Sequence, residues 1–224
     1  MSQAATSAAS RIVHVTRKQL LTLFGIVPLG VYVFLHLGTN LYSLAGAEAF
    51  NAAVDRSRAN PAFLVLEIVG LAIPLLAHTV IGFMEMAKSR PNNVRYGFLD
   101  NLRYLLQRVS AIGLALFVVA HVVKARLFPE QQFLVNGHES FAGMHEAFSE
   151  PITLSVYVLG MLGVSYHLAN GLQTAATRTG LVISEAGRRR MTWVAGFVMV
   201  LLLAMSGLAI AGFMMDQPLV QLGR

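Results

Sequence analysis

The sequence has no cysteine and few charged residues. The absence of cysteine excludes disulfide bonds, thiolate metal sites and iron–sulfur clusters ligated by this chain. A bound metal must therefore use histidine, methionine or carboxylate ligands. Only 12% of the 224 residues are charged and 55% are hydrophobic, whereas soluble proteins carry about 25% charged residues. We therefore predict an integral membrane protein rather than a soluble enzyme.

Five apolar segments are long enough to cross a bilayer as helices, since a hydrocarbon core of about 30 Å needs about 20 helical residues. They are residues 20–44, 62–87, 105–128, 152–174 and 191–215. A barrel would instead show short alternating segments. We expect an all-α fold, with one five-helix transmembrane domain over residues 20–216 that is kinked at Pro28 and Pro74. Residues 140–148 are expected to form a short interfacial helix.

The distribution of basic residues predicts how the spans are oriented. Lys and Arg concentrate before the first span and in the second and fourth connections, while most acidic residues lie in the first and third connections. By the positive-inside rule, the extension 1–19 is cytoplasmic and the short tail 217–224 lies outside. This topology accounts for the net charge of +6 without a nucleic-acid partner.

Four of the seven histidines fall singly in four different spans. Because successive helices reverse direction, His36 and His121 are expected near the outer leaflet, and His78 and His167 near the inner one. One intramembrane histidine is readily explained as a polar contact between helices. Two pairs matched in depth instead favour two haems of the b type, each with two axial histidines. Zinc is disfavoured because it would want further cysteine or carboxylate ligands close by.

The residues around two of these histidines resemble a known family. The segments are Ile26-Val-Pro-Leu-Gly30 ahead of His36-Leu-Gly-Thr-Asn40, and Ser165-Tyr-His-Leu-Ala-Asn-Gly171 around the fourth histidine. With the spacing of the four histidines, they are similar to the five-span type of dihaem cytochrome b membrane anchor found in succinate:quinone oxidoreductases and quinol:fumarate reductases.

The resemblance implies a role for each histidine and for the chain. His36 and His121 would hold the distal haem, and His78 and His167 the proximal haem. The partners would be a flavoprotein subunit and an iron–sulfur subunit, and the electron acceptor would be menaquinone in the cytoplasmic membrane of a prokaryote. The chain itself would contain no dicarboxylate active site.

Further residues are expected to contact the cofactors. Haem propionates need cations or hydrogen-bond donors near the membrane surface. The candidates are Arg178, Thr22, Tyr104 and Arg108. A quinone site needs a hydrogen-bond donor and a path for protons. The candidates are Glu67, Asp55, Asn40 and Lys124 towards the outside, and Gln107 towards the inside. All of these are also explained as ordinary interfacial or surface residues.

The sequence leaves several alternatives open. Ser165 stands where some fumarate-reducing members of the family carry a glutamate, which favours succinate oxidation over a quinol:fumarate reductase. Another quinone-linked dihaem cytochrome b, such as a hydrogenase or formate dehydrogenase anchor, is a further possibility. A small transporter with histidine proton relays is disfavoured because the spans lack a mid-span carboxylate. A structural anchor without haem and a higher oligomer of the complex also remain possible.

Overall fold

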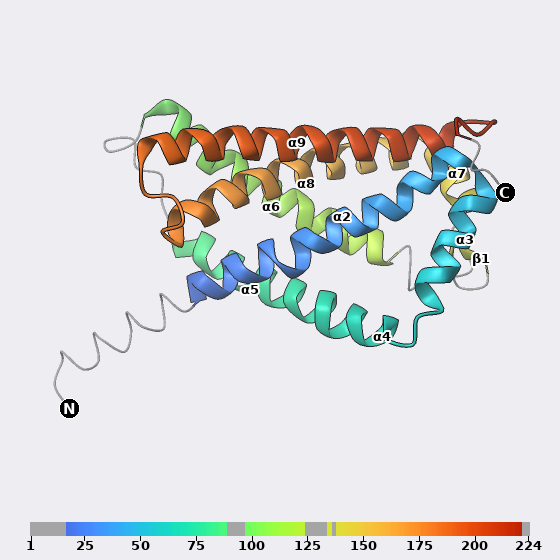
Figure 1. The fold of residues 1–224 in the computed structure, drawn as a ribbon, viewed down its shortest axis with the longest axis horizontal. Helices are drawn as coiled ribbons and strands as arrows, with labels where there is room; N and C mark the ends of the chain where they lie inside the picture. Colours follow the sequence, from blue (N-terminus) through green and yellow to red (C-terminus); the bar gives the residue numbers. More distant parts are fainter. Residues whose placement is uncertain (1–16, 89–96, 124–133, 136–137, 221–224) are drawn as a thin grey trace.

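The computed structural model describes residues 17–88, 97–123, 134–135 and 138–220. Five helices in it are long and apolar enough to cross a membrane. They are Arg17–Ala45, Phe63–Lys88, Phe98–Val122, Pro151–Arg178 and Glu185–Met214. The helices lie along the long axis of the molecule (Figure 1). The prediction of an all-helical bundle with five spans is confirmed.

Both prolines within the first two spans lie at irregularities of the helix. In the first span, residues 17–26 are separated by a turn at Val27 from α2 (Pro28–Asn40), which continues into the 3-10 helix η1 (Leu41–Ala45). The second span consists of α4 (Phe63–Val65), the π-helix η2 (Leu66–Ala72) and α5 (Ile73–Lys88), in which Pro74 is the second residue after the π-helix. Proline lacks the N–H that an α-helix needs at this point, so the regular ladder breaks there.

The remaining spans are more regular. They are α6 (Phe98–Val122), α8 (Pro151–Arg178) and α9 (Glu185–Met214). Helix α6 begins before the predicted start of its span because a polar turn containing Asp100, Asn101 and Arg103 precedes the apolar segment. Helix α8 packs against both α6 and α9. No residue in the most apolar stretch of α6 is buried within the chain, so this helix offers much of its surface to lipid or to a cofactor.

Two short helices cap the end of the bundle that carries the C-terminal residues (Figure 1). They are α3 (Ala47–Arg58) and α7 (Phe141–Ser149). Helix α7 confirms the predicted short helix, and the Ser140 hydroxyl caps it by accepting from the Gly143 N–H at 3.1 Å. Before it, β1 (Leu134–Val135) pairs antiparallel with β2 (His138–Glu139). Helix α3 was not predicted.

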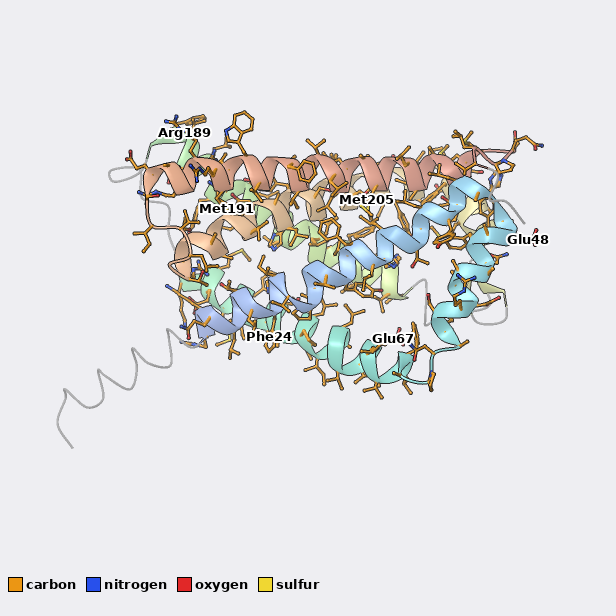
Figure 2. The ribbon with its side chains drawn as sticks, in the orientation of Figure 1. Phe24, Glu48, Glu67, Arg189, Met191 and Met205 are labelled. Atoms are coloured by element: carbon orange, nitrogen blue, oxygen red, sulfur yellow. The ribbon has the colours of Figure 1, made fainter. Side chains whose placement is uncertain are left out.

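The tightest core lies between these caps and the ends of α8 and α9. It consists of Phe50, Met144, Phe148, Tyr157 and Phe213, of which Phe50 and Phe213 are each only 1% exposed. The opposite end of the bundle holds the first turn of span one, the end of α5 and the turn from α8 to α9 (Figure 1). Figure 2 places Arg189 at that end and Glu48 at the capped end. Which end faces the cytoplasm stays a prediction.

Candidate functional site

The four intramembrane histidines lie in two pairs, one from spans one and three and the other from spans two and four. The ring centres of His36 and His121 are 5.9 Å apart, and those of His78 and His167 are 6.2 Å apart. A metal ion bound by two imidazole nitrogens at about 2 Å from each requires ring centres about 6 Å apart. Both separations therefore fit one metal ion between two rings.

The donor set of each pair is small. Among the residues that the structure describes, no group of three or more His, Cys, Asp or Glu side chains could hold a metal ion. A zinc site would need such a group, because it takes three or four protein ligands. A pair of imidazoles instead fits an iron whose remaining ligands come from a macrocycle. The residues present therefore suit a haem better than a bare metal ion.

The ring of His78 is oriented by the backbone of span one. Its Nδ1 atom lies 2.9 Å from the carbonyl oxygen of Leu21. A carbonyl oxygen only accepts, so Nδ1 carries the proton and the lone pair of the neutral ring is on Nε2. Metal-bound histidines are commonly oriented by an acceptor in this way. A Cβ atom on Gly25 would lie 2.6 Å from Cε1 of His78, so the ring can lie here only against a glycine.

The ring of His167 is instead surrounded by polar side chains. Gln107 Nε2 on α6 lies 3.1 Å from His167 Nδ1, and the amide oxygen of Gln107 accepts from Asn170 Nδ2 at 2.8 Å. Ser110 Oγ is 3.4 Å from His167 Nδ1. These contacts join α6 to α8.

Aromatic side chains surround the His36–His121 pair. The Tyr157 hydroxyl lies 3.1 Å from His121 Nδ1, and the ring of Phe117 stacks on His121 with centres 5.7 Å apart. Tyr32 stacks on His36 at 5.5 Å. Because Tyr157 also belongs to the aromatic core beneath α3 and α7, this pair is coupled to the capped end of the bundle.

The residues expected at the haem propionates lie in different settings. Arg178 is the last residue of α8 and is exposed. Arg108 Nη2 donates to the carbonyl oxygen of Met86 at 2.8 Å, and its guanidinium lies 4.3 Å from the ring centre of Tyr104. The Thr22 hydroxyl donates to the Lys18 carbonyl oxygen in its own helix at 2.9 Å. Arg108 and Thr22 thus already donate to backbone carbonyl oxygens, whereas Arg178 is exposed at the end of its helix.

The quinone-site candidates are also dispersed. Gln107 contacts the ring of His167, and Asn40 Nδ2 donates to the carbonyl oxygen of His36 at 2.8 Å. Asp55 is exposed on α3, and Glu67 lies in the π-helix η2 and is partly exposed (Figure 2). Lys124 lies outside the described residues. Two of the candidates are therefore adjacent to paired histidines, and the structure does not gather the set into one pocket.

Several residues around the rings were not predicted. They are the Leu21 carbonyl, Ser110, Tyr157 and Asn170. The sequence does indicate that Asn170 lies near His167, because a polar residue three positions later shares the same helix face. A backbone carbonyl gives no such indication, because every residue has one.

An α-helical bundle with histidines paired between alternate spans defines a multi-pass membrane protein with two candidate metal-ligand sites. Comparison with known proteins identifies the family. Residues 86–205 match the family described as "Succinate dehydrogenase/Fumarate reductase transmembrane subunit". The "Succinate dehydrogenase cytochrome b558 subunit" of Bacillus subtilis (strain 168) is 31% identical over 185 residues, which cover 83% of this chain and 90% of the relative.

The chain therefore belongs to the succinate dehydrogenase/fumarate reductase transmembrane subunit family. It is a membrane-anchor subunit of an enzyme complex of the succinate:quinone oxidoreductase type, as the resemblance noted from the sequence implied. No solved structure matches the chain.

Proposed function

We propose that this chain is the cytochrome b anchor of a succinate dehydrogenase that binds two haems b and passes electrons to menaquinone. The observation that carries the proposal is the pairing of four histidines from four spans, with ring centres 5.9 and 6.2 Å apart. The family match and the cytochrome b558 name of the Bacillus subtilis relative support it. His36 and His121 hold one haem, and His78 and His167 hold the other.

The protein's part in this function is to orient the ligands and to keep the site dry. When bound, haem supplies an iron that takes up and releases one electron at a time. The Leu21 carbonyl fixes the proton of His78 on Nδ1, and the Tyr157 hydroxyl lies at the corresponding atom of His121. Gln107 Nε2 lies close to both ring nitrogens of His167, at 3.1 and 3.5 Å. The apolar spans exclude water from both pairs.

The remaining partners follow from the same assignment. Electrons reach this chain from a flavoprotein subunit through an iron–sulfur subunit. The clusters belong to that second subunit, because this chain has no cysteine to ligate one. Arg178, Arg108, Tyr104 and Thr22 are the candidates to contact the propionates. Menaquinone binds near one pair, with Glu67, Asp55, Asn40, Lys124 and Gln107 as candidate contacts.

Succinate oxidation is favoured over fumarate reduction by the residue at position 165. Ser165 is fully buried in α8, and its hydroxyl has no hydrogen-bond partner in the part of the chain that the structure describes. A serine at this place supplies no carboxylate for a proton route through the membrane. An anchor of a quinol:fumarate reductase is the alternative within the same family.

The test is to purify the full chain in detergent and to measure its reduced-minus-oxidised spectrum and its pyridine haemochrome. Two haems b per chain are expected, with one or none in His36→Ala and His167→Ala. The control is His145→Ala, which removes a histidine on α7 whose Nδ1 donates to the Phe213 carbonyl at 2.7 Å. This variant should keep both haems. A wild-type chain without haem would overturn the proposal and leave a haem-free anchor or a histidine-relay transporter.

A further inference from the structure

An aromatic ring lies one helical turn before each histidine of the His36–His121 pair. Tyr32 stacks on His36 with ring centres 5.5 Å apart, and Phe117 stacks on His121 with ring centres 5.7 Å apart. In both contacts the two ring planes are only 15° from parallel. Residues four positions apart are neighbours on a helix surface, and a helical side chain leans back over the preceding turn. Each ligand of this pair is therefore stacked with a ring from its own helix.

The other histidine pair has no such arrangement. Pro74 stands four residues before His78, and Gly163 stands four residues before His167. Neither of these residues is aromatic. The His78 ring is oriented instead by the Leu21 carbonyl oxygen, which lies 2.9 Å from its Nδ1 atom. The stacked rings therefore distinguish one candidate ligand pair from the other.

The backbone of α8 confines the ring of Phe117. A Cβ atom on Gly160 would lie 2.6 Å from Cγ and Cδ2 of Phe117 and 2.7 Å from its Cε2, so the ring can lie here only against a glycine. Tyr157, three residues before Gly160 on α8, meets the Phe117 ring at an angle of 86° with ring centres 5.4 Å apart. A displacement of the Phe117 ring would disturb both contacts with α8.

The Tyr157 side chain contacts both rings of this stack. Its hydroxyl lies 3.1 Å from Nδ1 of His121, and its ring packs against Phe117. The hydroxyl holds one edge of the imidazole, while the Phe117 ring opposes rotation of the imidazole about the bond that joins it to Cβ. The His121 ring is thus held both by its own helix and by α8.

We propose that Phe117 and Tyr32 are positioning residues that set the planes of the His121 and His36 rings, with Gly160 making room for Phe117. The inference rests on the proposed function, since it assigns roles within one of the two haem sites. Groups around a metal-bound histidine orient its ring and tune the metal. The g-values of a low-spin ferric haem depend on how the planes of its two axial imidazoles are turned, so the EPR spectrum reports this orientation.

The test is the low-spin ferric EPR spectrum of the full chain purified with its haems. The signal of the His36–His121 haem is the one that is lost in His36→Ala. Phe117→Leu and Tyr32→Leu each remove a stacked ring, so each should shift or broaden the largest g-value of this signal. Tyr32→Phe retains the ring and should keep the wild-type signal. Gly160→Ala displaces the Phe117 ring without removing it and should change the signal as Phe117→Leu does.

Two substitutions on α9 are matched controls. Phe197→Leu removes an exposed ring from an apolar span, and Gly207→Ala adds a Cβ atom that meets nothing within 4 Å. Neither control should change either EPR signal. The signal of the His78–His167 haem is an internal reference and should be the same in every variant of Phe117, Tyr32 and Gly160.

The inference is overturned if Phe117→Leu and Tyr32→Leu leave the signal of the His36–His121 haem as it is in Phe197→Leu, or if they change the signals of both haems alike. If Phe117→Leu fails to bind this haem, the comparison of Tyr32→Leu with Tyr32→Phe decides, because Tyr32 is exposed and lies outside the tightest core. Equal spectra for these two variants would then overturn the inference, and a change in Tyr32→Leu alone would support it. A wild-type chain without two haems would instead overturn the proposed function.

Discussion

The Nδ1 atom of His78 in the second span lies 2.9 Å from the carbonyl oxygen of Leu21 in the first span. The orientation of this ring therefore depends on how the first two spans pack. The acceptor is a backbone carbonyl oxygen, which no side-chain substitution removes. Gly25, one turn after Leu21, lets the two helices approach closely enough for the contact. Substitutions in span one should consequently alter a ligand in span two.

Gly25→Ala should displace the ring of His78. The added Cβ atom would lie 2.6 Å from Cε1 and 2.9 Å from Nδ1, so the imidazole must move. Overpacking of this kind costs about 1–3 kcal/mol. We expect the His78–His167 haem to be lost or weakly bound while the other haem remains, as measured by the ratio of haem to protein.

Gly207→Ala in α9 is the control for this experiment, because a Cβ atom there meets nothing within 4 Å. Both substitutions exchange glycine for alanine inside an apolar span, so their effects on helix propensity are alike. If Gly25→Ala keeps its full haem content and an unchanged spectrum, the close contact between Gly25 and His78 does not exist in the loaded protein.

Tyr157→Phe should affect only the His36–His121 haem. The substitution removes the hydroxyl that lies 3.1 Å from His121 Nδ1 and keeps the ring that packs against Phe117 and Phe148. Loss of one such hydrogen bond costs about 0.5–1.5 kcal/mol. The potential of this haem should rise because its ligand becomes less basic.

Separate titration of the two haems checks this prediction. Tyr42→Phe is the matched control, since Tyr42 is 40% exposed in η1. Equal shifts in the two tyrosine variants would show that the Tyr157 hydroxyl does not act on His121.

Much of the architecture was predictable from the sequence. The spans follow from the length of the apolar segments, and the depth of each histidine follows from its position along a helix. Depth does not give the rotation of a helix about its axis, however, and that rotation determines which groups face a ring. Gln107 was predicted as a quinone contact from its polarity and its depth, and that stays a prediction. Its contact with the His167 ring could not be predicted, because it depends on how α6 and α8 are rotated.

Helix α3 shows a second limit of the sequence. Its segment contains Glu48, Asp55 and two arginines, and this charge pattern resembles a solvated loop. Only Phe50 and Ala53 are buried, three positions apart on one helix face. Two apolar positions are too few to distinguish a short interfacial helix from a loop, and the helix is stabilised by α7 and η1, which the sequence does not place beside it.

Gly212→Ala should loosen the crossing of η1 and α9. Ser43 Oγ donates to the Ala209 carbonyl oxygen at 3.0 Å, and a Cβ atom on Gly212 would collide with the Ser43 side chain and the Leu44 backbone. The cost should again be about 1–3 kcal/mol. We expect a lower midpoint of thermal unfolding in detergent, with Gly207→Ala unchanged. Equal midpoints for the two variants would contradict the tight crossing.

Arg178→Ala should lower the potential of the His78–His167 haem if Arg178 contacts its propionates. A nearby positive charge destabilises ferric iron, which carries one more positive charge than ferrous iron, so its removal favours the oxidised state. The effect should be modest because Arg178 is exposed at the end of α8 and its charge is screened by solvent. Redox titration at low ionic strength gives the largest shift.

Arg189→Ala removes an equivalent charge from the first turns of α9 at the same end of the bundle and is the control. A shift no greater than that of Arg189→Ala would exclude Arg178 and leave Arg108, whose guanidinium lies over Tyr104, as the cation to test next.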